Sequence, residues 1–130
     1  MQTGVVVLNF GEPPEPEEGP VIDYLERIFL NNASLEDHDS EEAMRARSRE
    51  LAERRAPGLL EEYREIGGSP LNEQARAQAV SLEEELRDRG LEARTYTAMQ
   101  FTEPFVGEAV ERARSDGVDR IVGLPVYPLC

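Results

Sequence analysis

The sequence predicts an α/β fold in which a parallel sheet lies between two layers of helices. Three short apolar segments, near residues 3–9, 92–98 and 119–124, alternate with longer segments of helical periodicity. Such alternation favours parallel strands joined by right-handed crossovers, so we expect about three strands in the order 2-1-3, with helices on both faces. A length of 130 residues suits one core, so residues 1–130 are expected to form a single domain.

The first strand is the clearest of the three. Val5-Val6-Val7-Leu8 is a continuous apolar run, of the kind that a parallel sheet buries on both faces. We therefore expect this strand at the centre of the sheet. Gly11 ends it and opens a loop, rich in Pro and Glu, that reaches Pro20.

Two helical stretches are expected before the paired glycines. Pro20 begins the first, and residues 31–40 form a polar loop after it. Ser40 can cap a second helix that runs to about Arg55, where Pro57 forces a break. Beyond the break, a helical stripe continues to the glycines.

The glycine turn opens into the clearest helix, over residues 70–89, with Ser69 as its N-cap and Pro70 at its first helical position. The last helix covers residues 102–115 and has Pro104 in its first turn. A glycine follows each of these helices closely and is expected to stop it.

Ligands of such sheets bind outside the carboxyl ends of the strands, where the strand order reverses. Here the loops at residues 10–11, 99–101 and 125–127 line that crevice. Since no glycine-rich phosphate-binding pattern follows the first strand, a nucleotide is not expected there.

The chain is strongly acidic, with 27 Asp and Glu residues, 14 basic residues that are all Arg, and a net charge of -13. Nucleic acid is excluded as a natural partner, because phosphate binding needs a basic surface. Such charge repels itself unless salt screens it, which predicts a halophilic host.

The sequence also predicts where the protein is located. No apolar stretch is long enough for a membrane span, and no signal peptide precedes Gly4. Cys130 alone forms no disulfide framework, so a cytoplasmic protein is expected.

Four segments, taken in order, carry a recognisable pattern: Val5-Val6-Val7-Leu8-Asn9-Phe10-Gly11-Glu12-Pro13, Tyr24-Leu25-Glu26-Arg27-Ile28-Phe29-Leu30, residues 54–71 and residues 97–128. Together they resemble the N-terminal portion of the ferrochelatases, class II chelatases that insert ferrous iron into a porphyrin in heme biosynthesis. The resemblance implies a chelatase-like fold and a halophilic archaeon as the source. It also implies iron as a substrate, and protoporphyrin IX or coproporphyrin III as the porphyrin.

The same resemblance implies polar porphyrin contacts in the third segment. Arg55 would pair with a propionate, and Tyr63 would donate a hydrogen bond. Ser69, together with the N-terminus of the following helix, would take carboxylate oxygens.

It also implies a flat apolar surface at the strand ends. Phe10 would lie under the macrocycle, where a phenyl ring cannot ligate iron. Gln100 and Phe101 stand where animal-type relatives have more polar residues, so the pocket is expected to be less polar.

No catalytic residue and no metal ligand is expected in this chain, because the catalytic histidine and metal-site glutamate of the family lie beyond Cys130. His38, the only histidine, is expected to be a solvated loop residue. No tightly bound cofactor is expected, and a single cysteine cannot hold the iron–sulfur cluster of some family members.

Three functions remain open from the sequence. In the first, the chain is the porphyrin-binding N-terminal portion of a ferrochelatase, natural or truncated, and is inactive alone; whether a second polypeptide supplies the missing half stays open. Alternatively, it is a small homodimeric enzyme of the cobaltochelatase kind, although those carry a histidine just after the first strand. In the third reading, it is a non-catalytic tetrapyrrole carrier or assembly subunit.

Overall fold

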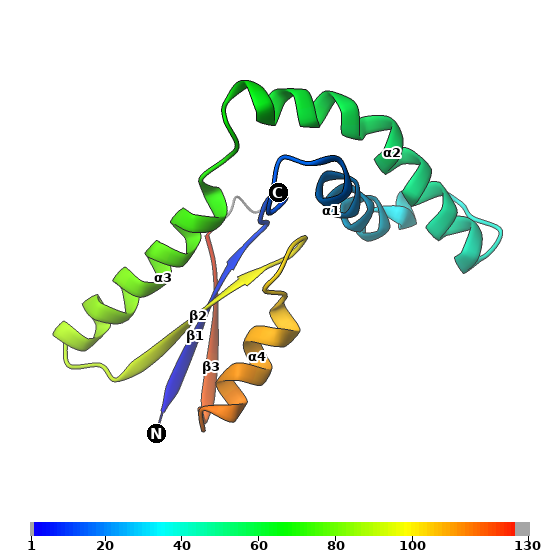
Figure 1. Cartoon of the computed structure of the whole chain (residues 1–130). Helices are drawn as coiled ribbons and strands as arrows, with labels where there is room; N and C mark the ends of the chain where they lie inside the picture. The colour runs from blue at the N-terminus through cyan, green and yellow to red at the C-terminus, as the bar shows by residue number, and fades with distance from the viewer. Residues whose placement is uncertain (1, 127–130) are drawn as a thin grey trace. The chain divides into compact units, whose positions relative to one another are not determined.

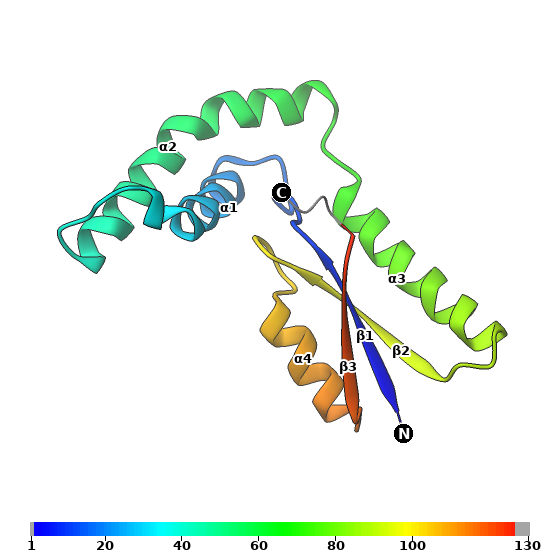
Figure 2. The same cartoon turned by 180° about the vertical axis from the view of Figure 1, so that it is seen from behind.

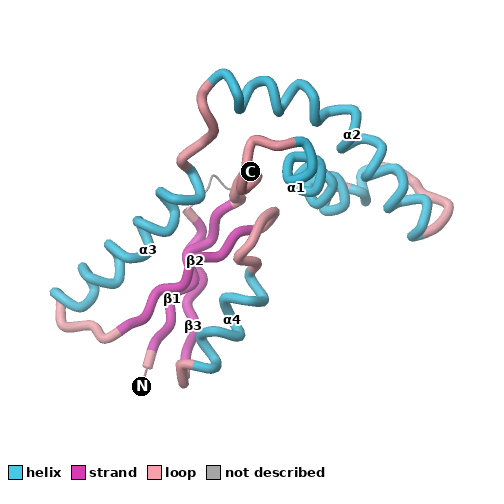
Figure 3. Tube along the Cα trace, viewed as in Figure 1, coloured by secondary structure: helices cyan, strands magenta, loops and turns pink. Residues whose placement is uncertain are grey.

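The structure is a computed structural model that describes residues 2–126 (Figure 1). Strands and helices follow one another largely as the sequence predicts, and Figure 3 shows them along the Cα trace. In chain order the elements are β1 (Thr3–Asn9), α1 (Glu18–Asn31), the short 3₁₀ helix η1 (Ala33–Leu35), α2 (Glu41–Glu65), α3 (Leu71–Asp88), β2 (Ala93–Met99), α4 (Val106–Ser115) and β3 (Arg120–Pro125).

The chain divides into two compact units. The sheet unit comprises residues 1–11 and 70–130 and contains the three strands with α3 and α4. The helical unit comprises residues 12–69 and contains α1, η1 and α2. The expectation of a single domain over residues 1–130 stays a prediction.

The sheet is parallel with the order β2-β1-β3, which confirms the predicted topology and the central place of the first strand. Val5 pairs with Thr95 of β2 on one side and with Val122 of β3 on the other. Because all strands run the same way, the residues that end β1 and β2, Asn9 and Met99, pair at one edge of the sheet.

Helices cover both faces of the sheet, as Figure 2 shows from behind. Alternate residues of β1 point to opposite faces, which is why Val5, Val6 and Val7 are all buried, while Leu8 is partly buried. The α3 face contains Val5, Val7 and Ala79, with Leu82, Leu86 and Ala93 packed against them. The α4 face contains Val6, Tyr96, Ala98, Ala109 and Ala113, with Leu8 and Val118 packed against them.

In the helical unit, α1 packs along α2. The buried side of α2 carries the small residues Ser48, Ala52 and Ala56, and α1 contributes Val21 and Leu25 to its own buried side. The hydroxyl of Ser40 accepts a hydrogen bond from the Ala43 N–H at 3.0 Å, which confirms the predicted N-cap of α2. Small side chains let two helices approach closely, so α2 contributes little apolar side-chain volume to this interface.

The predicted break at Pro57 is wrong, because α2 continues through it to Glu65. Pro57 has no N–H to donate to the carbonyl of Glu53 and crowds it. Both residues are exposed, so water can satisfy that carbonyl. The buried neighbours Ala52 and Ala56 hold the opposite side of the helix in place.

Other helix ends differ from the prediction by a few residues. Helix α1 begins at Glu18, and η1 lies within the predicted loop. Pro70 takes the N-cap position of α3, so the assignment of that position to Ser69 is wrong. Helix α4 begins only at Val106, two residues after Pro104. A proline costs no helical hydrogen bond just before a helix or in its first turn, so the pattern alone cannot fix the first residue.

Candidate functional site

Two of the predicted site residues meet at the carboxyl edge of the sheet. The rings of Phe10 and Phe101 stack with 6.0 Å between their centroids and 25° between their planes. Phe101 is buried, at 8% exposed, whereas Phe10 keeps 41% of its surface exposed. Phe101 therefore supports one side of the Phe10 ring while much of that ring stays available to a ligand.

Backbone hydrogen bonds fix this aromatic pair. The Phe101 N–H donates to the carbonyl of Phe10 at 3.0 Å, and the Gln100 N–H donates to the carbonyl of Asn9 at 2.9 Å. The two loops thus extend the pairing of β1 and β2 beyond the ends of the strands. Gln100 is exposed beside the pair, so its amide can reach a ligand. Val126 joins from β3 by donating to Leu8 at 3.0 Å, whereas Tyr127 lies outside the described residues.

Gly11 makes possible the turn that follows Phe10, whose ring, stacked on Phe101, forms an aromatic wall at this edge of the sheet. Its φ of 82° is in the left-handed region, and a Cβ atom there would lie 2.6 Å from Cγ2 of Thr102 and 3.0 Å from Cβ of Met99. Any side chain would force the two loops apart. The glycine therefore sets the close approach that brings Phe10 to Phe101.

Asn9 is a polar residue at this edge that the sequence prediction omits. It is only 6% exposed, and its Nδ2 atom has no hydrogen-bond partner among the described residues. A buried amide donor without a partner is unfavourable and uncommon. The only signal in the sequence is a polar residue that closes an apolar strand, which does not reveal whether its amide is satisfied.

The other predicted contacts lie in the helical unit. Arg55 is on α2, where its side chain is half-exposed and Nη2 lies 3.6 Å from Oε1 of Glu62. Exposed ion pairs of this kind contribute little and break easily. A ligand carboxylate can therefore compete for the guanidinium group, which binds it with a planar pair of donors.

Tyr63 is half-buried in the last turn of α2, two residues before its end. Burial raises the pKa of its phenol, and the carboxylates of Glu12 and Glu62 raise it further. The neighbouring Tyr24 is more deeply buried, and its pKa is raised to about 12 by burial, then by Tyr63 and Glu12. Both phenols keep their protons near neutral pH, so they donate hydrogen bonds and do not act as bases.

Ser69 follows a tight turn at the end of α2. Gly67 and Gly68 have φ values of 74° and 91°, and the Gly68 N–H donates to the carbonyl of Tyr63 at 2.7 Å. This left-handed turn satisfies the last carbonyls of the helix. Ser69 is half-buried immediately after it and precedes Pro70 and α3. Because Arg55, Tyr63 and Ser69 belong to one unit and Phe10, Gln100 and Phe101 to the other, their convergence on one ligand stays a prediction.

His38 lies in a loop, as expected, but it is half-buried and its Nε2 atom lies 2.9 Å from the carbonyl oxygen of Ala33, so it is less solvated than the sequence predicts. The hydrogen bond ties the loop to η1, which a reading of polar composition does not reveal.

Among residues 2–126 there is no group of three or more His, Asp, Glu or Cys side chains arranged to hold a metal ion. In the same part of the chain, no helix has an apolar stretch long enough to cross a membrane.

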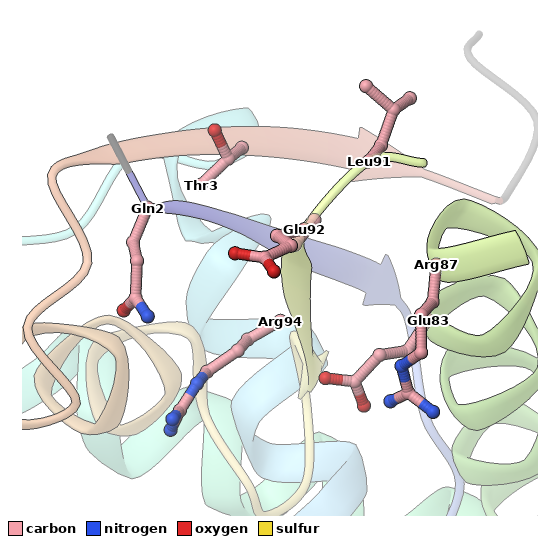
Figure 4. Close-up of a pocket in the computed structure, with 8 residues that line it drawn as sticks. Gln2, Thr3, Glu83, Arg87, Leu91, Glu92 and Arg94 are labelled. Atoms are coloured by element: carbon pink, nitrogen blue, oxygen red, sulfur yellow. The ribbon is translucent and has the colours of Figure 1, made fainter. Parts of the chain in front are cut away.

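A pocket of about 270 Å³ lies at the opposite end of the sheet, beside the amino ends of β1 and β2 (Figure 4). Its charged lining is balanced, because Glu83 and Glu92 lie there with Arg87 and Arg94. Arg94 also pairs with Asp116, with 3.5 Å between Nη1 and Oδ2. Since ligands of parallel sheets bind at the carboxyl ends of strands, we do not assign this pocket to the site.

Comparison with known proteins supports the resemblance. The ferrochelatase family model matches residues 2–130. The ferrochelatase of Parasynechococcus marenigrum (strain WH8102) is 36% identical over 129 residues, which are 98% of this chain and 32% of that protein. The ferrochelatase of Synechococcus elongatus (strain ATCC 33912 / PCC 7942 / FACHB-805) is 45% identical over 69 residues, 52% of this chain and 18% of that protein. The ferrochelatase of Synechococcus sp. (strain CC9605) is 35% identical over 129 residues, which are 98% of this chain and 32% of that protein. The chain therefore spans about a third of the length of the Parasynechococcus marenigrum and CC9605 proteins.

Proposed function

Because this chain belongs to the ferrochelatase family, we propose that it binds a porphyrin and serves as part of a metal chelatase of heme biosynthesis. The observation that carries this proposal is the stacked pair of Phe10 and Phe101 at the carboxyl edge of the sheet. A porphyrin is a flat aromatic ring system, and an exposed phenyl ring held from behind offers it a flat apolar surface. Offset stacking of aromatic rings adds about 0.5–1.5 kcal/mol beyond the burial of their surface.

Polar anchors for the propionates come from the helical unit. Arg55 needs only to leave Glu62, 3.6 Å away, to grip a carboxylate. Tyr63 can donate its proton in a hydrogen bond because its raised pKa keeps the phenol neutral. Ser69 would add a hydroxyl and the adjoining helix terminus.

Metal insertion also needs a base that removes the two pyrrole protons. A positioned base contributes about 10²–10⁴-fold to such a step. Of the proposed ligand contacts, the sheet unit offers phenyl rings and an amide, and the helical unit offers a guanidinium group, a hydroxyl and a phenol with a raised pKa, none of which is a base near neutral pH. We therefore propose that ferrous iron is inserted only when a second polypeptide segment supplies the base and the metal ligands.

The alternatives have less support from the site. A homodimeric cobaltochelatase would need a histidine after the first strand, where Asn9, Phe10 and Gly11 stand. A non-catalytic tetrapyrrole carrier would use the same aromatic wall, so it differs from our proposal only in what the completed assembly does. A halophilic archaeal source remains a prediction from the acidic composition and the resemblance, and a cytoplasmic location remains a separate prediction from the sequence.

A porphyrin titration tests the proposed site. We expect Phe10→Ser to weaken binding about tenfold or more, since burying a Phe side chain contributes about 1.5–3 kcal/mol and tenfold in Kd is about 1.4 kcal/mol. Leu35→Ser is the matched control, because Leu35 is an exposed apolar residue on η1. The change in the porphyrin Soret band measures both, and equal affinity of the two variants would contradict the proposed wall.

A second pair of variants tests the propionate anchor. Arg55→Gln should weaken porphyrin binding severalfold, because it removes the bidentate donor for a carboxylate. Arg45→Gln is its control on the same helix, where Arg45 pairs with Glu41 at 3.1 Å. If both variants bind the porphyrin equally well, Arg55 is only an ion-pair residue of α2.

A further inference from the structure

The pocket at the amino ends of β1 and β2 has charged walls of both signs (Figure 4). Its volume of about 270 Å³ lies just below the range of about 300–1,000 Å³ that is typical of ligand pockets, so it suits a small molecule. Glu83 and Arg87 extend from α3, and Glu92 and Arg94 lie at the start of β2. These four groups give the lining no net charge, although the whole chain carries -13.

Three of these four charged groups form no ion pair within residues 2–126. Glu83 precedes Arg87 by four residues on α3, which is the order that favours an ion pair along a helix. The neighbouring Glu85 and Arg89 form such a pair, with 2.8 Å between Oε1 and Nε. In the described part of the chain, Glu83, Arg87 and Glu92 have no such partner. Their charges therefore remain available to a ligand in the pocket.

Glu83 and Arg87 are the pocket charges best placed to hold a ligand. Glu83 is half-buried, and removing a carboxylate from water is unfavourable unless a partner replaces the water. Arg94 is already engaged, because Nη1 lies 3.5 Å from Oδ2 of Asp116. The same Asp116 oxygen accepts a hydrogen bond from the Tyr96 hydroxyl at 2.7 Å. Arg87 is therefore the guanidinium group that a ligand anion can use.

The arrangement of these charges selects the class of ligand. A simple anion would meet Arg87 but would be repelled by the two carboxylates, and a simple cation would be repelled by the two guanidinium groups. A zwitterion presents each charge to its opposite. The Cβ atoms of residues four apart on a helix are about 5–6 Å apart, so the two charges of the ligand must be close together. The ammonium and carboxylate groups of an α-amino acid meet this requirement.

The rest of the lining includes an apolar surface for a side chain. Leu91 is 57% exposed and Ala93 is half-buried, and both line the pocket. We propose that this pocket binds a free α-amino acid with an aliphatic side chain. Arg87 donates to the ligand carboxylate through its planar pair of donors, and Glu83 accepts from the ligand ammonium group. The aliphatic side chain lies against Leu91 and Ala93, where its burial favours binding.

An NMR titration of the isotope-labelled chain with L-leucine tests this site. We expect the amide signals of residues 91–94 to shift as L-leucine binds. Arg87→Gln and Glu83→Gln should each raise the Kd about tenfold or more, because each removes a hydrogen bond between charged groups. Arg89→Gln is the matched control, since Arg89 lies at the end of the same helix and pairs with Glu85 outside the pocket lining. It should leave the Kd unchanged.

Two modified amino acids test which ligand group each residue contacts. L-Leucinamide lacks the carboxylate and N-acetyl-L-leucine lacks the ammonium group, so both should bind the parent chain more weakly than L-leucine does. Arg87→Gln should bind L-leucine and L-leucinamide about equally, because the partner of the carboxylate is gone. Glu83→Gln should bind L-leucine and N-acetyl-L-leucine about equally for the same reason. A role in folding alone would not produce this pattern.

Several results would overturn the amino-acid site. These are no shift in residues 91–94 at about 10 mM L-leucine, well above a millimolar Kd, a Kd that both pocket variants leave unchanged, and a parent chain that binds all three compounds equally. An Arg87→Gln variant that still prefers L-leucine to L-leucinamide would overturn it as well. The pocket lies at the end of the sheet opposite the proposed porphyrin contacts, so Phe10→Ser should bind L-leucine as the parent does. The two sites can therefore fail independently.

Discussion

In the sheet unit, both β1 and β2 bury large side chains, such as Val7 and Met99, whereas in the helical unit the large buried side chains come from α1 and the buried side of α2 carries the small residues Ser48, Ala52 and Ala56. Ion pairs are distributed the other way. Most of those in the described residues lie in the helical unit, where Arg49 alone contacts Asp23, Glu26 and Glu53 at 2.9–3.1 Å. Apolar burial therefore stabilises both units, and the helical unit adds most of the ion pairs to it.

This difference matches the chemistry assigned to each unit. A flat apolar wall needs a rigid support, which the buried Phe101 and the packed sheet give to Phe10. Anchors for flexible propionates need charged groups that can change partner, which Arg55 provides through its exposed contact with Glu62. The comparison teaches that the proposed apolar contacts all lie in the sheet unit and the proposed charged and hydroxyl contacts all lie in the helical unit.

The largest expected effect is the loss of a buried side chain in the sheet unit. Met99→Ala should lower the free energy of unfolding by about 2–5 kcal/mol, because it removes a fully buried side chain and leaves a cavity. Met44→Ala is the matched substitution in α2, where Met44 is only half-buried. Urea unfolding measures both. Equal losses would break the distinction between the two units.

A smaller effect is expected from the buried phenol of the helical unit. The pKa of Tyr24 rises from 10.0 in the unfolded chain to about 12 in the fold, so its contribution to stability is complete below pH 10 and is lost between pH 10 and 12. The loss is at most about 3 kcal/mol, since one pKa unit corresponds to about 1.4 kcal/mol. Tyr24→Phe keeps the ring without the titration. If that variant loses as much stability toward pH 12 as the parent chain, Tyr24 is not the group responsible.

Asn9 should have little effect on stability and a larger one on ligand binding. Asn9→Leu replaces a buried donor that has no partner by an apolar group of similar volume, so the free energy of unfolding should change by less than about 1 kcal/mol. If the Nδ2 atom serves the ligand, porphyrin affinity falls while thermal unfolding stays the same. A clear loss of stability would show that the amide has a structural partner.

The smallest effect concerns exposed charges and depends on salt. Arg49→Met should lower the melting temperature in dilute buffer, and the difference from the parent should shrink as potassium chloride is added, because salt screens exposed pairs. Arg114→Met is the control in the sheet unit, where Arg114 lies 3.5 Å from Glu111. A deficit for Arg49→Met that high salt does not reduce would show that packing by the side chain matters more than its charge.

The sheet could be predicted because its signals are local. The run Val5–Leu8 fits only a strand buried on both faces, and the alternation of elements then fixes a parallel sheet with this strand at its centre. Pro57 misled the prediction because the cost of a proline depends on what surrounds it. On α2 it lies at the exposed side, while Ala52 and Ala56 pack on the buried side.

The site was predictable in its loops but not in its contacts. Strand topology places Phe10 and Gln100 at one edge, yet the stacking on Phe101 depends on the register of two loops that are far apart in sequence. The pairing of Arg55 with Glu62 depends on how a flexible side chain folds back along the helix. The unsatisfied amide of Asn9 required atomic positions around it.

The central claim is that the chain binds a porphyrin without inserting metal into it. The direct measurement is an anaerobic titration of the 130-residue chain with protoporphyrin IX and ferrous iron, followed through the Soret band. We expect a band shift on binding that Phe10→Ser weakens, and iron insertion no faster than in buffer, because the proposed contacts include no base near neutral pH. Insertion above the buffer rate that persists in His38→Ala would contradict the claim and would favour a self-sufficient chelatase.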